Sequence, residues 1–236
     1  MDKIKEIKEE LNKYIDKEKA EFLPKFFKSY PGGYGEGDLF IGVSVPNQRK
    51  VAKKFKDLSL EEIQNLLNED IHEYRLTGLI ILVDKYEKAK SDEDKQQIVD
   101  FYIKNIDRVN NWDLVDSTAY KILGPYLIYK DKSLLYEFAN SGHLWKQRVA
   151  IIGTKYFISK GMYEDTLRIS EILLKHQHDL IHKAVGWMLR EVGNKDKEVE
   201  KEFLNKYYMK MPRTMLRYAI EKFEKEERQK YLKGEI

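Results

Sequence analysis

Residues 110–117 read Asn-Asn-Trp-Asp-Leu-Val-Asp-Ser, and this octapeptide is one of a series of related segments that decide the fold. In a helix, Trp112 and Asp116 are four residues apart, so the indole and the carboxylate project from the same face. An aromatic face beside an anion suits a cation. By itself, the segment fits at least as well a core tryptophan near a helix start with a solvated aspartate, so the rest of the chain must decide.

Similar segments recur along the chain. The charged residues Arg75, Asp113, Arg148 and Lys183 occupy matching positions that are 38, 35 and 35 residues apart, and Arg213 follows after a further 30. A period of about 35 to 40 residues with two helices is typical of a helical solenoid, because each helix pair buries its apolar side only against neighbouring pairs. The sequence therefore predicts an all-α fold, a curved solenoid of helical repeats.

Local signals also favour helices. Isoleucine and leucine recur at three- and four-residue steps from Ile4 to Ile15 and predict an amphipathic first helix, and a second follows with the phenylalanines after residue 20. Ser59 with Glu62 is a capping-box start, and Pro46 suits a first helical position. No alternating pattern of strand length appears.

A glycine-rich segment interrupts the helices. Residues 29–46 hold five of the thirteen glycines and predict a connector rather than a helix. Its Gly-x-Gly-x-Gly at 33–37 is followed by neither the Lys-Ser/Thr of a phosphate-binding loop nor a helix start, which argues against nucleotide binding. We expect one domain over residues 1–236, with N-terminal helices and this connector in 1–45 and stacked helix pairs in 46–236.

Composition excludes several classes of protein. The absence of cysteine excludes disulfides and thiolate metal sites, and the N-terminus never gives the apolar run that a signal peptide or membrane span needs. We expect a cytoplasmic monomer. The net charge of +3 permits a nucleic acid partner without requiring one, because the arrangement of the basic residues matters more than their sum.

The repeat predicts such an arrangement. On a curved solenoid, corresponding residues of successive second helices line the concave side. The aligned row would join the acidic pair Asp113 and Asp116 to a series of bases: Arg75, Arg148, Lys183, Arg213 and Arg217. The sequence thus predicts a basic, DNA-binding track with an anion in its middle.

All three tryptophans lie near this row. Trp112 is paired with Asp116, and Trp187 lies four residues after Lys183. Trp145 follows Leu144 near a predicted helix start, and we interpret it as a packing residue. We expect Trp112 and Trp187 to face the groove on the concave side of the solenoid.

The histidines His176, His178 and His182 form the remaining candidate site. His178 and His182 have the i,i+4 spacing of a metal pair. No cysteine or second histidine pair completes a ligand set, and the segment opens a helix where histidine often serves as a cap, so we predict no metal site.

Four segments in order give the chain a resemblance to the AlkD-like DNA alkylation repair glycosylases, which are built from HEAT-like helical repeats. They are GEGDLFIGVSVPNQRKVAK at 35–53, NWDLVDS at 111–117, LWKQRVAII at 144–152 and HKAVGWMLREVG at 182–193. The resemblance covers nearly the whole chain. It implies a DNA glycosylase of base excision repair that hydrolyses the N-glycosidic bond of cationic N3- or N7-alkylated purines in duplex DNA, without a cofactor and without deep base flipping.

The resemblance also implies roles for individual residues. Asp116 resembles the catalytic aspartate, Trp112 and Trp187 resemble the aromatic residues of the lesion site, and Arg148 resembles the arginine next to the aspartate. Elementary chemistry agrees, because an alkylated purine that already carries a positive charge leaves without a general acid. A fixed carboxylate can then stabilise the charge that develops on the sugar.

Two points leave room for another interpretation. Some members of the family carry a tyrosine on the second N-terminal helix, where this chain has Phe26 or Phe27, so a hydroxyl contact from there is in doubt. A non-catalytic HEAT-like scaffold that binds distorted or branched DNA would share the helices and the basic track. The joint presence of the tryptophans, the aspartate and the arginine favours the enzyme.

Overall fold

The computed structural model describes residues 2–236, and the elements of regular secondary structure in this part of the chain are all helices. Among these residues the only β interaction is an isolated bridge between Leu39 and Ile71. Two compact units are formed, one up to Thr118 and one from Ala119 to Ile236. The all-α class predicted from the sequence is confirmed, whereas the single domain over residues 1–236 stays a prediction.

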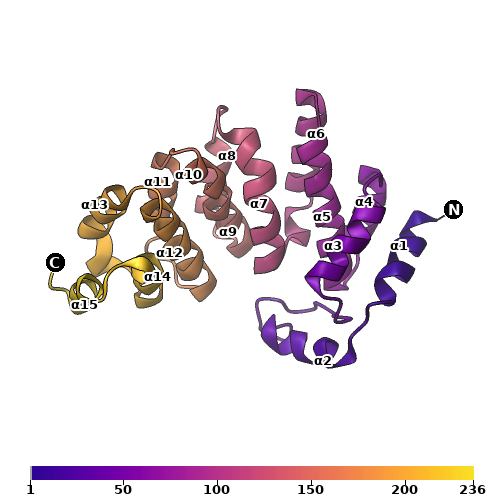
Figure 1. Ribbon diagram of the computed structural model, residues 1–236, viewed down its shortest axis with the longest axis horizontal. Helices are drawn as coiled ribbons and strands as arrows, with labels where there is room; N and C mark the ends of the chain where they lie inside the picture. The colour runs from indigo at the N-terminus through magenta and orange to yellow at the C-terminus, as the bar shows by residue number, and fades with distance from the viewer. Residues whose placement is uncertain (1) are drawn as a thin grey trace. The chain divides into compact units, whose positions relative to one another are not determined.

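The N-terminal unit contains six complete helices, a short 3-10 turn and the start of a seventh helix (Figure 1). They are α1 (Lys3–Asn12), α2 (Lys17–Phe26), α3 (Val45–Lys54), α4 (Leu60–Leu67), α5 (His72–Lys88), α6 (Asp92–Lys104), η1 (Ile106–Arg108) and α7 (Trp112–Leu127). Helix α7 continues across the boundary into the C-terminal unit.

Helix starts agree with the sequence signals. The Ser59 hydroxyl accepts from the Glu62 amide while the Glu62 carboxylate accepts from the Ser59 amide, so the predicted capping box at α4 is confirmed. Pro46 lies in the first turn of α3. Ile15 departs from the prediction, because α1 has ended at Asn12 and the Ile15 side chain is exposed.

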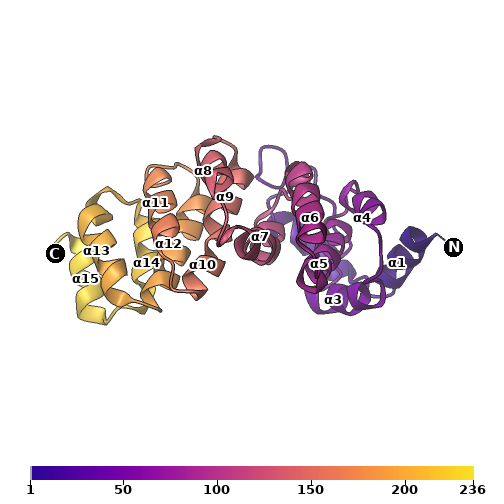
Figure 2. The ribbon, with the colours of Figure 1, turned by 90° about the horizontal axis from the view of Figure 1, so that it is seen from above.

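Helix α5 is the centre of the N-terminal unit. It packs against α3, α4 and α6, and Figure 2 shows it between α3 and α6. Most of its residues are buried, including the charged side chains of Glu73 and Arg75. Helix α2, by contrast, buries none of its ten residues and lies apart from α4, α5 and α6 in Figure 1.

The glycine-rich connector is fastened to α5. The buried carboxylate of Glu73 accepts hydrogen bonds from the amides of Ile41 and Gly42. Gly42 has a φ of +81°, and a Cβ there would lie 2.0 Å from the carbonyl oxygen of Asp16, so only glycine fits. The connector is therefore held in one course between α2 and α5.

The C-terminal unit continues from α7 with shorter helices. They are α8 (Ser133–Asn140), α9 (Leu144–Gly153), α10 (Lys155–Ser159), α11 (Glu164–Ile172), α12 (Asp179–Gly193), α13 (Lys197–Tyr207), η2 (Tyr208–Lys210), α14 (Arg213–Ala219), η3 (Ile220–Lys222) and α15 (Lys225–Lys233). Helix α12 is central here, because it packs against α9, α13 and α14. Trp145 is 7% exposed in α9, so its interpretation as a packing residue is confirmed.

Within residues 2–236, none of the helices combines the length and the apolar character needed to span a bilayer.

Candidate functional site

The predicted site residues are divided between the two units. Arg75, Trp112 and Asp116 belong to the N-terminal unit, and Arg148, Lys183, Trp187, Arg213 and Arg217 belong to the C-terminal unit.

Trp112 opens α7 and is supported by phenylalanines. Its amide donates to the Asn111 side-chain oxygen (2.9 Å). The indole stacks on the Phe27 ring at a centroid distance of 5.3 Å and meets the Phe26 ring edge-on at 5.9 Å. The position where some family members carry a tyrosine thus contributes aromatic surface without a hydroxyl.

Asp116 lies one turn further along α7. Its four-residue spacing from Trp112 within this helix puts the carboxylate and the indole on the same face. Asp116 is half-buried. Behind it is the buried Tyr102, whose hydroxyl is hydrogen-bonded to Thr118 (2.8 Å); burial raises the Tyr102 pKa, and the nearby negative charge of Asp116 adds to that shift.

A chain of mostly buried charged groups begins at Asp113, the residue after Trp112. His72 Nε2 is 2.8 Å from Asp113 Oδ2, and His72 Nδ1 is 3.0 Å from Asp38 Oδ2. Asp38 in turn binds the Arg75 guanidinium (2.5 Å) and accepts from the Asn111 amide group (3.2 Å). The chain joins the connector, α5 and the first turn of α7.

His72 is held as a cation in this chain. Burial opposes its charge, but the Asp113 and Asp38 carboxylates outweigh that cost and raise the His72 pKa to about 9. For Asp38, burial raises the pKa, but hydrogen bonding by His72 and the positive charge of Arg75 prevail and hold it below its usual value. Charges therefore alternate along the chain, which is how buried ions are tolerated.

Arg75 requires a correction. Its side chain is 1% exposed, and its guanidinium donates to Asp38 and to the carbonyl oxygens of Glu69 and Asp70 (3.0 Å each). A DNA phosphate cannot reach it, so the prediction that Arg75 belongs to an exposed basic track is wrong. Arg75 instead anchors the connector to α5.

A mainly apolar cavity of about 330 Å³ lies next to Trp112. Its walls come from α2, the connector and the adjoining start of α3, α5 and the start of α7. The lining includes Leu23, Phe26, Phe27, Phe40, Val43, Val45, His72, Glu73, Trp112 and Asp113. The phenylalanines in this list continue the aromatic surface that supports Trp112.

Trp187 lies in α12 of the C-terminal unit and is half-buried. Its indole nitrogen donates to Glu191 (3.0 Å). The Lys155 ammonium lies 4.5 Å from the Trp187 ring centroid and 4.8 Å from that of Tyr120. The Trp187 ring thus already serves as a surface for a cation.

The bases of the C-terminal unit differ in access. Arg148 is 4% exposed and donates to the Leu180 carbonyl oxygen, so its burial argues against a direct phosphate contact. Lys183 is partly exposed and lies 2.7 Å from Asp179. Arg213 and Arg217 are exposed.

The histidine segment serves the local structure. His178 caps α12 by accepting from the Leu180 amide (3.1 Å), and His182 donates to the His176 carbonyl oxygen. His176 is also hydrogen-bonded to Gln147 (2.9 Å). In the part of the chain from residue 2 onward, no cluster of three or more potential ligands suited to a metal ion occurs.

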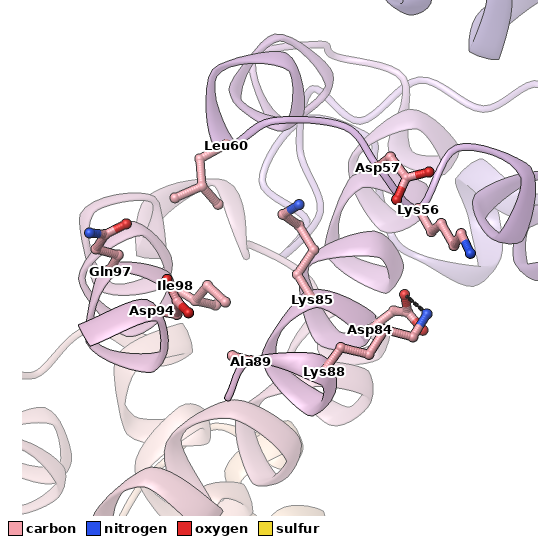
Figure 3. Close-up of a pocket in the computed structure, with 10 residues that line it drawn as sticks. All are labelled: Lys56, Asp57, Leu60, Asp84, Lys85, Lys88, Ala89, Asp94, Gln97 and Ile98. Carbon is pink, nitrogen blue, oxygen red and sulfur yellow. Dashed lines mark hydrogen bonds and ion pairs between the residues drawn. The ribbon is translucent and has the colours of Figure 1, made fainter. Parts of the chain in front are cut away.

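A second, polar depression of about 410 Å³ lies on the surface of the N-terminal unit (Figure 3). It is lined by the loop between α3 and α4, the first residue of α4, the end of α5 and the first half of α6. Its three lysines are balanced by three aspartates, and Lys88 is paired with Asp84 (2.6 Å). It contains none of the predicted site residues, and its balanced charge does not select a ligand.

Sequence reasoning missed several residues near Trp112 and Trp187. Asp38 and His72 are 34 residues apart, and Tyr120 and Lys155 are 35 apart, so no short-range spacing joins them. Helical periodicity could have identified Tyr120, because it lies four residues after Asp116.

Comparison with known proteins gives the family. The family model described as "DNA alkylation repair enzyme" matches residues 7–223. No curated protein sequence matches the chain.

Solved structures share the fold. A predicted DNA alkylation repair enzyme from Enterococcus faecalis has a TM-score of 0.68 at 15% identity, over 88% of this chain and 96% of that one. A protein described as belonging to a new family related to the HEAT-like repeat DNA glycosylases, with affinity for branched DNA structures, has a TM-score of 0.58 at 15% identity, over 92% and 83%. The predicted HEAT-like repeat fold is confirmed, and from the extent of the family match, the chain belongs to the DNA alkylation repair enzyme family.

Proposed function

We propose that the protein is a DNA glycosylase that removes cationic N3- or N7-alkylated purines from duplex DNA by hydrolysis of the N-glycosidic bond. The observation that carries this proposal is the placement of Trp112 and Asp116 on one face of α7, in a chain of the DNA alkylation repair enzyme family. The proposal also assigns roles to Trp187 and Arg148, which belong to the C-terminal unit.

Asp116 supplies negative charge where positive charge develops. As the glycosidic bond of an alkylated purine breaks, the purine leaves as a neutral base and the sugar becomes an oxocarbenium-like cation. A carboxylate fixed by a helix stabilises that cation and orients the attacking water. The bond from water to C1′ forms as the bond from C1′ to nitrogen breaks, the bonding electrons leave with the neutral purine, and the water releases one proton to the solvent.

The two indoles provide selectivity for a cation. The π face of an indole attracts a positive charge by about 0.5 to 2 kcal/mol, depending on desolvation. Trp112 is held in place by Phe26 and Phe27, so its side chain should lose little conformational entropy when a ligand binds to its face. The ammonium of Lys155 above Trp187 supports the same preference in the other unit.

The bases have different roles in the proposal. Lys183, Arg213 and Arg217 have accessible side chains and are the proposed phosphate contacts. Burial limits Arg148 to an electrostatic or structural role. Binding to duplex DNA then depends on a small number of surface contacts, and its salt dependence will report their number.

The test is direct. Purified protein is incubated with duplex DNA that carries 7-methylguanine or 3-methyladenine, and released base is separated and quantified. We expect release above the spontaneous rate, which is measured in parallel without protein. No release above that background from either lesion would sink the proposal.

A second candidate function is binding of branched DNA without chemistry. It is favoured by the similarity in fold to a relative described as having affinity for branched DNA. The same incubation separates the two, since a scaffold of this kind binds branched DNA but releases no base.

A further inference from the structure

Helix α2 is the least embedded helix of the N-terminal unit and exposes aromatic side chains. None of its residues is buried. Phe22 is 58% exposed and Phe26 is 49% exposed, and their ring centroids are 5.8 Å apart. Exposed large aromatic groups gathered on one helix usually mark an interaction surface.

The cavity beside Trp112 lies directly under this helix. Leu23, Phe26 and Phe27 line it together with Phe40, Val43 and Val45 from the connector and the start of α3, and the Phe27 and Phe40 rings stack on each other at a centroid distance of 5.2 Å. Phe26 therefore belongs both to the exposed surface and to the cavity wall. The result is a continuous aromatic series from solvent, through Phe22 and Phe26, to the Trp112 indole.

The polar groups of the cavity are already satisfied. Gln48 donates to the Val43 carbonyl oxygen (2.7 Å), and Glu73 accepts from the Ile41 and Gly42 amides. Asp113 is paired with His72. A ligand would thus be held by ring stacking and apolar contact, not by recognition of its polar edges.

The α2 segment carries a small excess of positive charge. Residues 16–28 contain four lysines against two glutamates and one aspartate. Lys19 is paired with Asp16 (2.9 Å), and Lys17, Lys25 and Lys28 are also exposed. Aromatic rings for bases, with basic side chains for the backbone, form the combination that binds unpaired nucleotides without sequence preference.

We propose that the cavity between α2 and the Phe40–Val45 segment receives one unpaired base of a DNA strand, which stacks on Phe26. The proposal rests on the proposed function only in taking DNA as the partner. It differs from the proposed removal of lesions, because the occupant of the cavity is an unstacked base of any type. Purines should bind better than pyrimidines only because their rings have a larger area.

Fluorescence tests this directly. One duplex carries a single bulged 2-aminopurine, and a second carries the same base paired with thymine. At one fixed salt concentration, we expect the wild-type protein to bind the bulged duplex about tenfold more tightly, since base stacking on protein aromatics has that order of effect. The fluorescence of the bulged base should also be quenched on binding.

Three variants test whether the preference for the bulged duplex arises at this cavity. Phe26→Ala removes the stacking ring, Val45→Trp fills the cavity, and Phe22→Ser removes a ring that is 58% exposed. We expect the first two to abolish the preference for the bulged duplex and the third to reduce it. Tyr129→Ala is the matched control, because Tyr129 is 85% exposed in the C-terminal unit, and it should retain the full preference.

Equal affinity of the wild type for both duplexes would overturn the proposal, as would an unchanged preference in both Phe26→Ala and Val45→Trp. A shift from dimer to monomer in Phe22→Ser, with no change in DNA binding, would show instead that this surface joins two copies of the chain. Failure of the proposed glycosylase is distinguishable, because it would abolish base release and leave the preference for the bulged duplex intact.

Discussion

His72 Nε2 and Asp113 Oδ2 are 2.8 Å apart, although the two residues are separated by 41 positions in the chain. This contact ties the start of α7, which carries Trp112, to the first residue of α5. The two hydrogen bonds from the imidazole to the carboxylates are ionic, and hence strong, only while the imidazole is protonated. The stability of the N-terminal unit should therefore depend on pH through His72.

We expect the free energy of unfolding to fall as pH rises from about 6.5 to about 9. The His72 pKa is raised to about 9 in the folded protein, so its full stabilisation is present below the ordinary pKa of 6.5 and is lost as the pH passes the folded value. The loss should be about 3 kcal/mol, because each unit of pKa shift corresponds to about 1.4 kcal/mol. Urea unfolding at several pH values measures it.

The variant His72→Gln should be less stable than the wild type at pH 6. Its own free energy of unfolding should be nearly the same at pH 6 and at pH 9. A proton NMR titration of the His72 ring gives an independent value of the pKa. An ordinary pKa for this histidine, or an identical pH profile in His72→Gln, would contradict the prediction.

Arg75 should matter for stability and not for DNA. Replacement by Met leaves Asp38 as a buried charge with one partner fewer, which costs about 3 to 5 kcal/mol. The salt dependence of duplex binding should not change, because Arg75 is 1% exposed. Thermal unfolding and binding titrations on the same preparation measure both effects, and a reduced salt slope in a folded Arg75→Met protein would contradict this expectation.

Surface bases in the C-terminal unit should matter for DNA binding and not for stability. Each of Lys183→Ala and Arg213→Ala should lower the slope of log K against log salt by about 0.9, because one fewer counterion is released. Neither should lower the thermal midpoint appreciably. Lys90→Ala in the N-terminal unit, outside the predicted track, is the charge-matched control, and three identical slopes would show that the track is not the DNA surface.

The comparison of Arg75 with Trp112 shows what sequence can reveal. The pairing of Trp112 with Asp116 is local, because helical periodicity alone places side chains four residues apart on one face. The capping box of Ser59 and Glu62 is local in the same sense. These features, the all-α class and the repeat period were all predictable.

The burial of Arg75 was not predictable from spacing. The repeat aligned it with the accessible bases Lys183 and Arg213 as well as with the buried Arg148, but Asp38 in the glycine-rich connector, 37 positions away, binds its guanidinium in the interior. The same holds for the cavity beside Trp112, whose walls come from four separate parts of the chain. Contacts of this kind depend on the course of the connector, which its glycines leave undetermined at the level of sequence.

Asp116→Asn separates catalysis from binding. Asparagine keeps the size and much of the hydrogen bonding of the aspartate but removes its charge, so duplex affinity should stay equal or rise slightly. Base release should nevertheless fall by about two orders of magnitude or more, because a fixed charge at a developing cation is worth about 3 kcal/mol of transition-state stabilisation.

Single-turnover release of 7-methylguanine, corrected for spontaneous loss, measures this difference, with binding measured on the same duplex. Trp112→Ala and Trp187→Ala should lower both lesion preference and rate, since an indole contacts the lesion and sugar in ground and transition states alike. If Asp116→Asn and the wild type release base at the same corrected rate, the carboxylate is only a solvated group, and a DNA-binding scaffold becomes the better account of this fold.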